Sequence, residues 1–187
     1  MIGVPLLMLL ASVLAASEAR AGEELLDKPA AEWEVTHWIN SPPLSLGDLR
    51  GRVVLVRWWT APDCPFCAAS APTLNDLDRR YRDQGLTIVG FYHHKADSPL
   101  DPAAVERHAA RFGFRFPLAI DAEWKTLHRW WLDQAGEGDR KWTSVSFLID
   151  ARGIVRYIHP GGRYAPGESE ARALEERILE LLKRPGD

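Results

Sequence analysis

Short continuous hydrophobic runs alternate along the chain with longer stretches in which apolar residues are spaced three or four positions apart. The runs cover residues 53–56, 86–92 and 116–120. Runs of this kind are typical of strands that are buried on both faces of a sheet. A further apolar stretch at residues 33–39 predicts a short strand ahead of them. The alternation therefore predicts strands separated by helices.

Four stretches have the spacing of amphipathic helices. Their predicted buried residues are Ala71, Leu74, Leu77 and Tyr81 in the first, Val105, Ala109 and Phe112 in the second, Trp124, Leu127, His128 and Trp131 in the third, and Ala171, Leu174, Ile178, Leu181 and Leu182 in the fourth. Pro72 lies inside the first helix, where a proline is expected to kink it. Asp101 and Pro102 have the residue types of a helix cap and a first helical position, so the second helix should begin there.

The last part of the chain predicts a β-hairpin. Residues 144–149 and 154–159 are apolar runs on either side of Asp150-Ala151-Arg152-Gly153, a sequence typical of a turn. A hairpin requires an antiparallel pair, whereas strands joined through a helix can be parallel. The sequence therefore predicts an α/β protein with a central mixed sheet, helices on both faces and an N-terminal strand extension.

The beginning of the chain has the pattern of a targeting segment. Residues 2–16 are almost entirely apolar, and Ala19-Arg20-Ala21 has the small-x-small pattern of a signal-peptide cleavage site. The run is shorter than the about 20 residues that a transmembrane helix needs. We expect residues 1–21 to be a signal peptide, residues 22–41 an N-terminal extension and residues 42–187 the main domain. A buried N-terminal helix and an uncleaved membrane anchor are the alternatives.

Composition and charge narrow the possible functions. The chain has 187 residues, 46% of them hydrophobic, and a formal net charge of -3. High apolar content with low net charge argues against intrinsic disorder. No block of lysine and arginine stands out, so a nucleic-acid-binding protein is disfavoured. The two cysteines are too few for a disulfide scaffold, so the spacing between them is the main indication of their chemical role.

Cys64-Pro65-Phe66-Cys67 places two thiols on one turn at the start of the first predicted helix. At that distance the sulfurs can form a disulfide with little backbone movement. The first sulfur would face the positive end of the helix, which stabilises a thiolate, the attacking species in disulfide exchange. We therefore expect Cys64 to be the catalytic nucleophile and Cys67 to resolve the mixed disulfide. Asp63 could cap the helix, although its charge would oppose thiolate formation.

Three other interpretations of the cysteine pair remain open. Cys64 and Cys67 could bind copper or zinc together with a distant histidine, as in a metal-binding or carrier protein. They could instead form a purely structural disulfide. A thiol peroxidase would need a Pro-x-x-x-Thr/Ser-x-x-Cys pattern, but Arg57 and Ala61 occupy its proline and hydroxyl positions. The redox interpretation itself requires no cofactor and no bound metal.

The sequence Val53-Val54-Leu55-Val56-Arg57-Trp58-Trp59-Thr60-Ala61-Pro62-Asp63, followed by the two-cysteine motif, resembles the exported thioredoxin-like proteins of the TlpA and ResA type, a branch of the redoxin superfamily. Ala71-Pro72-Thr73-Leu74 and Phe147-Leu148-Ile149-Asp150 resemble the segments that follow their motif and form their closing hairpin. The resemblance spans roughly residues 42–183. It implies a thioredoxin fold for residues 42–187.

The resemblance also implies a function and a location. Proteins of this type exchange disulfides with protein substrates in the bacterial periplasm or at the outer face of the membrane. We therefore expect protein thiols or disulfides as substrates, and a membrane or periplasmic electron donor as a partner. Contact with the membrane itself is expected only if the N-terminal segment stays uncleaved.

Three positions depart from the pattern of that family. Asp63 replaces an aromatic residue before the first cysteine, and Ser70 falls where an acidic residue follows the second. Ser144 falls at the position of a cis-proline opposite the disulfide. The missing proline could open access for a metal. The missing acid removes a carboxylate base that the cytochrome-maturation subtype would use.

Substrate contacts are expected at Pro65, Phe66, Thr143 and Ser144. The backbone of the loop at Thr143 and Ser144 could face the sulfurs and pair with an extended substrate chain. The Pro-Phe dipeptide offers no cation that would stabilise a thiolate. On that ground alone we expect a reductant or an isomerase rather than a strong oxidant.

The histidines are weaker candidates. His93-His94-Lys95 follows a predicted strand at the end where such sheets often place functional loops. We expect these to be solvated loop residues, with a ligand or acid–base role as the alternative. His128 is expected to pack beside Trp124, and His159 has no assigned partner.

The tryptophans are numerous for one domain. Trp58 and Trp59 precede the cysteine motif, and one of them is expected to pack under it. Trp130, Trp131 and Trp142 flank a polar loop. We expect ordinary core packing for them, with an apolar patch for a protein partner as the alternative.

Overall fold

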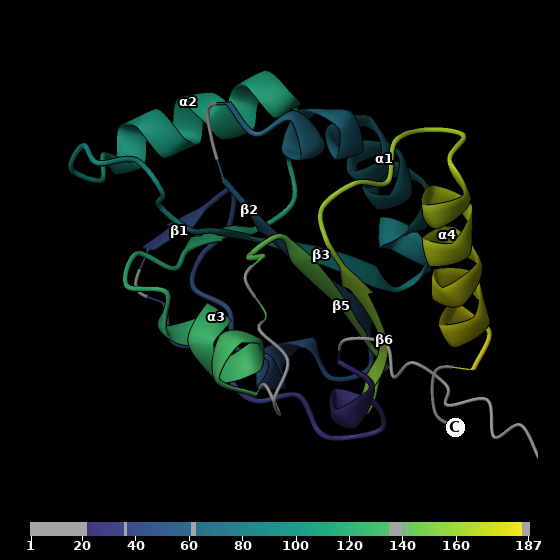
Figure 1. The fold of residues 1–187 in the computed structure, drawn as a ribbon. Helices are drawn as coiled ribbons and strands as arrows, with labels where there is room; N and C mark the ends of the chain where they lie inside the picture. Colours follow the sequence, from purple (N-terminus) through teal and green to yellow (C-terminus); the bar gives the residue numbers. More distant parts are fainter. Residues whose placement is uncertain (1–21, 36, 61–62, 135–139, 141, 185–187) are drawn as a thin grey trace, which may run out of the picture.

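The computed structural model describes residues 22–35, 37–60, 63–134, 140 and 142–184. The predicted signal peptide therefore lies outside the described residues, as does the turn at Pro62. The described residues form one mixed sheet with the strand order β1-β4-β3-β2-β5-β6 (Figure 1). The strands are β1 His37–Ile39, β2 Val53–Trp59, β3 Leu86–Tyr92, β4 Leu118–Ile120, β5 Val145–Ile149 and β6 Val155–Pro160. The helices are α1 Pro65–Tyr81, α2 Pro102–Phe112, α3 Lys125–Trp130 and α4 Ser169–Leu182.

Strand directions confirm the predicted mixed sheet. β2 runs parallel to β3, and β3 runs parallel to β4. β5 is antiparallel to both β2 and β6, which confirms the predicted hairpin, and β1 is antiparallel to β4. Trp59 pairs with Tyr92 at the carboxyl ends of β2 and β3. The chain leaves the sheet at this end to enter α1, so the cysteine motif lies there.

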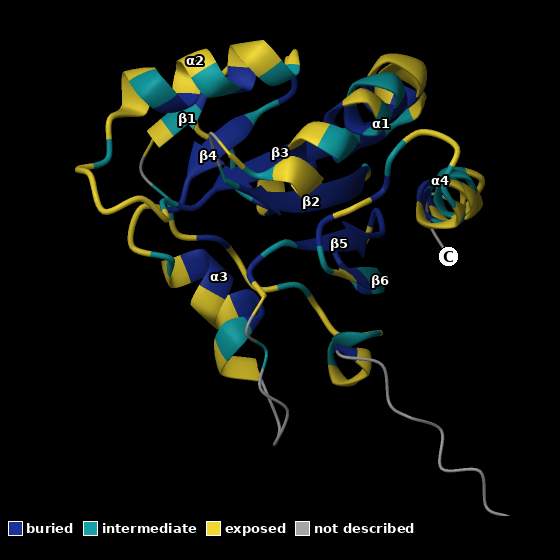
Figure 2. Ribbon diagram, turned by 45° about the horizontal axis from the view of Figure 1, so that its top comes forward, coloured by how far each residue is buried: buried dark blue, intermediate teal, exposed yellow. Residues whose placement is uncertain are grey.

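Helices cover both faces of the sheet, as predicted. Side chains alternate across a strand, so successive residues of β2 point to opposite faces. Leu55 and Trp59 pack with residues of α1, α2 and α4 on one face. Val56 and Trp58 pack with residues of α3 on the other face, together with the segment before β1. Figure 2 shows the buried sheet between these two layers.

Local signals place α1 and α2 where the sequence predicts them. Asp101 caps α2, its side chain accepting a hydrogen bond from the Ala103 amide at 3.0 Å, and Pro102 is the first helical residue. Gly113 ends this helix with a φ of 73°, a left-handed conformation that favours glycine. α1 continues through Pro72 as far as Tyr81 and buries its predicted apolar face.

Two predicted elements differ from the structure. The strand expected over residues 33–39 is confined to His37–Ile39, because Trp33 instead turns into the core and donates its indole N–H to the Leu44 carbonyl at 2.6 Å. His128 was expected to be packed, but its side chain is 49% exposed and pairs with Asp133 at 2.8 Å. α3 begins only at Lys125, after Trp124 with a φ of 59°, and its short buried face excludes position 128.

Most of the tryptophans belong to the core. Trp58, Trp59, Trp130 and Trp131 are buried, which confirms core packing for them. Trp59 lies in the same apolar cluster as Cys67, so it is the tryptophan that packs beneath the motif. Trp142 differs, because its side chain is 43% exposed.

Within the described ranges, no helix combines the length and hydropathy needed to cross a membrane.

Helix α4 should contribute strongly to stability through Leu174, which is completely buried. We expect Leu174→Ala to lower the free energy of unfolding by about 2–5 kcal/mol, because it leaves a cavity between α4 and the sheet. Arg177→Ala on the exposed side of the same helix is the control and should change it by less than about 0.5 kcal/mol. Urea unfolding measures both, and equal effects would contradict the packing described here.

Candidate active site

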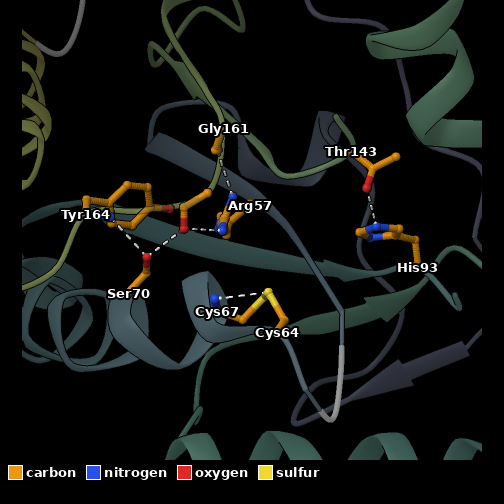
Figure 3. The surroundings of a disulfide bond; sticks show 9 residues. Arg57, Cys64, Cys67, Ser70, His93, Thr143, Gly161 and Tyr164 are labelled. Carbon is orange, nitrogen blue, oxygen red and sulfur yellow. Dashed lines mark hydrogen bonds between the residues drawn. A yellow bond between two sulfur atoms is a disulfide. The ribbon is translucent and has the colours of Figure 1, made fainter. Parts of the chain in front are cut away.

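Cys64 and Cys67 form a disulfide at the amino end of α1 (Figure 3). Their Cα atoms are 5.2 Å apart, which is ordinary for a disulfide. Pro65 is the first helical residue. A backbone N–H at this position has no partner within the helix, so proline loses no helical hydrogen bond there. The local sequence thus brings the sulfurs together without help from distant parts of the chain.

The two sulfur atoms lie in different environments. Cys67 is 2% exposed and belongs to the apolar cluster beneath α1, whereas Cys64 is partly exposed. Cys64 Sγ accepts a hydrogen bond from the Cys67 amide at 3.1 Å. A backbone N–H at a helix amino end favours negative charge on the atom it faces, so a thiolate at Cys64 would be stabilised.

Cys64 itself is the cap of α1. Its backbone is extended, with φ -80° and ψ 101°, and its side chain accepts the hydrogen bond that a capping residue accepts. The expectation that Asp63 could cap this helix is therefore wrong. Asp63 is exposed and lies one residue outside the capping position, because the sulfur already occupies the place of a capping oxygen.

Thr143 and Ser144 lie immediately before β5, the strand that pairs with β2. Thr143 is buried, and its hydroxyl is 2.8 Å from His93 Nε2. His93 follows β3, and its backbone N–H donates to the Trp59 carbonyl at 3.1 Å. His93 thus links the carboxyl ends of the two central strands to the loop before β5.

The expectation that His93 is a solvated loop residue is wrong. Its side chain is completely buried, and its ring meets Trp124 edge-on at 5.2 Å. Burial, with the nearby charges of Lys95 and Arg57, lowers the pKa of His93 to about 3. The imidazole is therefore neutral at physiological pH. Its Nδ1 has no hydrogen-bond partner among the described residues.

Ser70, where the family resemblance leads one to look for an acid, has a structural role. It is fully buried one helical turn beyond Cys67, and its hydroxyl donates to the Gly162 carbonyl at 2.8 Å. The Tyr164 amide donates back to the same hydroxyl at 3.1 Å. Tyr164 in turn is hydrogen-bonded through its phenol to Ser146 at 2.9 Å. Ser70 therefore attaches the segment after β6 to the first turns of α1.

Arg57 is a buried cation in the central strand, and Figure 3 shows it in the surroundings of the disulfide. Its guanidinium donates to the Gly162 carbonyl at 2.8 Å and to the Gly161 carbonyl at 3.4 Å. Its Cζ lies 5.3 Å from the centre of the Tyr164 ring. Burial lowers the pKa of Arg57, but a guanidinium stays protonated in proteins.

His159 is buried on β6 and lies edge-on to Tyr164 at 5.1 Å. Burial, with the charge of Arg57, lowers its pKa. No group of three or more His, Cys, Asp or Glu side chains is arranged to hold a metal ion in the part of the chain that the structure describes. A metal carrier would therefore lack, among these residues, a ligand set beyond the cysteines.

Cys64, Pro65, Phe66, Thr143 and Ser144, which the sequence predicts as site residues, lie at the end of the sheet where α1 begins. The sequence prediction did not include the polar cluster made by Arg57, Ser70, Gly162, Tyr164 and Ser146. One signal was available, because an arginine inside a continuous apolar strand is a buried charge that needs an explanation. Contacts from the segment after β6 could not be read from local pattern.

The chain is similar to known families and proteins. The sequence profile of the Redoxin family matches residues 40–174. Protein DipZ of Mycobacterium bovis is 33% identical over 157 residues, which cover 81% of this chain and 20% of DipZ. The chain thus spans only about a fifth of that relative.

Two further proteins match this chain over most of their own length. The thiol-disulfide oxidoreductase ResA of Halalkalibacterium halodurans is 25% identical over 167 residues, which cover 89% of this chain and 80% of ResA. A secreted Mycobacterium tuberculosis disulfide oxidoreductase has a similar fold, with a TM-score of 0.58 and 21% identity. That match covers 85% of this chain and 99% of the other. The thioredoxin fold inferred from the sequence is confirmed.

The low pKa of His93 has a consequence for stability. The unfolded chain binds a proton at His93 below about pH 6.5, whereas the folded chain does so only near pH 3. Stability is therefore full above pH 6.5 and falls with pH towards 3. Lowering the pH from 7 to 4.5 should therefore reduce the free energy of unfolding by about 2–3 kcal/mol through His93 alone.

We expect His93→Gln to lose that part of the acid sensitivity in urea unfolding at the two pH values. His94→Gln, which changes the neighbouring and more exposed histidine, should retain it. An unchanged pH dependence in His93→Gln would show that the imidazole is not kept neutral by the fold.

Gly162 provides a second test of the site. A Cβ atom there would lie 2.8 Å from Ser144 Cβ and 2.9 Å from Arg57 Nη2. We expect Gly162→Ala to lower the free energy of unfolding by about 1–3 kcal/mol, because closely packed groups must move apart. Gly47→Ala, whose added Cβ would meet nothing closer than 3.5 Å, is the matched control. Chemical unfolding compares the two, and a loss at Gly162 no larger than at Gly47 would refute this packing.

Proposed function

Because this chain belongs to the Redoxin family, we propose that it is a thiol-disulfide oxidoreductase that acts on protein substrates through Cys64 and Cys67. One observation carries the proposal. The disulfide lies at the amino end of α1 with one partly exposed sulfur and one buried sulfur. That asymmetry separates the atom that meets a substrate from the atom that releases it.

The exchange needs only the two cysteines and a substrate. A substrate thiolate attacks Cys64 Sγ, the Cys64–Cys67 bond breaks, and Cys67 leaves as a thiolate. A second substrate thiolate then attacks the substrate sulfur of the mixed disulfide, and Cys64 leaves as a thiolate. In the reverse direction Cys64 attacks a substrate disulfide and Cys67 resolves the intermediate. The Cys67 amide, 3.1 Å from Cys64 Sγ, favours the charged form of Cys64 in both directions.

Substrate binding is proposed at Pro65, Phe66, Thr143 and Ser144. Phe66 is 50% exposed, and together with Trp142 it makes up the exposed large hydrophobic residues among those the structure describes. Phe66 lies between the cysteines, and Trp142 directly precedes Thr143. Side chains of this kind support contact with apolar parts of an extended substrate segment, and the backbone at Ser144 would pair with that segment as a neighbouring strand does.

Location and partners are also proposals. The apolar run over residues 2–16 supports export to the periplasm or the outer face of the membrane, with residues 1–21 as signal peptide. Residues 22–41 would then be an extension of a redox domain formed by residues 42–187. An exported dithiol must exchange electrons with a membrane or periplasmic donor or acceptor, because the cytosolic thiol pool does not reach it.

The central test uses insulin as the disulfide substrate and dithiothreitol as the reductant. We expect the unmodified chain to accelerate insulin reduction and Cys64→Ser to lose at least about 99% of that acceleration, because the attacking thiolate is absent. Cys67→Ser should accumulate a covalent adduct with insulin, detected by mass spectrometry under non-reducing conditions, because nothing resolves the mixed disulfide.

The Cys64→Ser, Cys67→Ser double variant is the control and should form no adduct. An unmodified chain without insulin-reducing activity, together with a Cys67→Ser variant that traps nothing, would refute the proposed function. Trapping by Cys64→Ser but not by Cys67→Ser would instead reverse the roles of the two cysteines.

A further inference from the structure

Arg57 lies on the same face of the sheet as the disulfide. It alternates along β2 with residues of the opposite face, and its neighbours on its own face, Leu55 and Trp59, pack in the cluster that contains Cys67. The Gly162 carbonyl accepts both the Arg57 guanidinium and the hydroxyl of Ser70. Ser70 is one helical turn beyond Cys67, so the guanidinium lies against the first turns of α1, as Figure 3 shows.

The charge on Arg57 has no carboxylate partner among the described residues. The buried aspartates are engaged elsewhere. Asp78 pairs with Arg82, Asp150 pairs with Arg156, and Asp121 accepts the backbone N–H groups of α3. Within the described ranges, the hydrogen bonds of Arg57 go to the two glycine carbonyls and its ring contact is to Tyr164, so its buried positive charge has no counter-charge there.

The titratable groups around it are neutral at physiological pH. Burial lowers the pKa values of His93 on the β3 side and His159 on β6, and it raises the pKa of Tyr164 after β6. Charged groups on the solvent side include Asp63, which is exposed beside Cys64, Lys95, whose charge reaches His93, and Glu170, whose charge reaches His159. Arg57 is therefore a buried cation on the disulfide face of the sheet, without a carboxylate partner among the described residues.

We infer that Arg57 is a positioning residue for the redox step, whose buried charge stabilises the thiolate that forms when the Cys64–Cys67 bond opens. The inference rests on the proposed function. Opening the disulfide takes two electrons from a partner dithiol, which becomes a disulfide. In the reduced pair Cys64 is the thiolate and Cys67 holds one proton of the partner dithiol. The second proton of the partner goes to solvent.

The consequence is a more oxidising pair. In the disulfide form the guanidinium has no counter-charge, and in the reduced form the thiolate supplies one, so the charge favours reduction of the pair. Pro65 and Phe66 offer no cation within the motif, which led to the expectation of a reductant or an isomerase. Arg57 supplies that cation from the strand beneath, and it shifts the expectation towards an oxidant or an isomerase.

The test measures the equilibrium of the full chain with reduced and oxidised glutathione and the pKa of the Cys64 thiol, followed by ultraviolet thiolate absorbance. We expect Arg57→Met to lower the equilibrium constant for reduction about tenfold, which corresponds to about 30 mV. The pKa of the Cys64 thiol should rise by about one unit, because an opposite charge has been removed. Arg57→Lys keeps the charge and should stay within about threefold of the unmodified chain.

Arg52→Met is the matched control, because it removes the same charge about 17 Å away along β2, at a rise of about 3.3 Å per residue. Arg52 binds Thr87 at 2.6 Å at the opposite end of the strand and should leave potential and thiol pKa unchanged. An Arg57→Met variant with unchanged potential and thiol pKa would overturn the inference.

A measurement on the unmodified chain covers the case in which Arg57→Met does not fold. A Cys64 thiol pKa at or above about 8.5, the value of a free cysteine, would overturn the inference, and a value below about 7 would support it. A pair that does not exchange with glutathione at all would contradict the proposed function, and this inference with it. A pair that exchanges but does not respond to Arg57 would contradict this inference alone.

Discussion

The carbonyl oxygen of Gly162 joins three parts of the fold that are far apart in the sequence. It accepts the guanidinium of Arg57 from the central strand and the hydroxyl of Ser70 from α1, both at 2.8 Å. Gly162 itself lies in the segment that follows β6, and a side chain there would collide with Ser144. This backbone group, with no Cβ atom beside it, therefore helps to hold the first turns of α1, and the disulfide at its amino end, against the sheet.

Burying the charge of Arg57 beneath the disulfide costs free energy. Moving an ion out of water costs several kcal/mol even after relaxation, and removal of the cation would leave only neutral carbonyls, which the Ser70 hydroxyl already partly satisfies. Burial is the main cause of the lowered pKa values of His93 and His159, and the charge of Arg57 lowers both further. Arg57 thus adds a buried positive charge to a site where neutral imidazoles, hydroxyls and aromatic rings lie around the sulfurs. Asp121, the buried carboxylate that follows β4 at this end, accepts backbone N–H groups of α3, and Ser70 stands where the cytochrome-maturation subtype would use a carboxylate base.

Much of the fold follows from local pattern. The apolar runs at β2, β3 and the β5–β6 hairpin, the cap at Asp101 and the apolar face of α1 are all short-range features, and each was found where the sequence predicted it. The errors concern residues whose surroundings come from distant segments. His93 was expected in solvent because it follows a strand, but Thr143 and Trp124 close over it. His128 was expected in the core because of its spacing, but the buried face of α3 is made by Thr126, Leu127 and Trp130, and the side chain at position 128 is half exposed.

The amino-acid sequence by itself determined the chemistry of the disulfide, because two cysteines three residues apart at a helix start meet through the geometry of a single turn. It also determined the order of strands and helices, because hydrophobic period reflects the local backbone. Only the tertiary structure decided the electrostatic environment of that disulfide. Arg57, Ser70 and Gly162 are separated by up to 105 residues, and their contact exists because the sheet and α1 bring them together. Charge interactions depend on distance and burial in space, and neither quantity is contained in the spacing of residues along a chain.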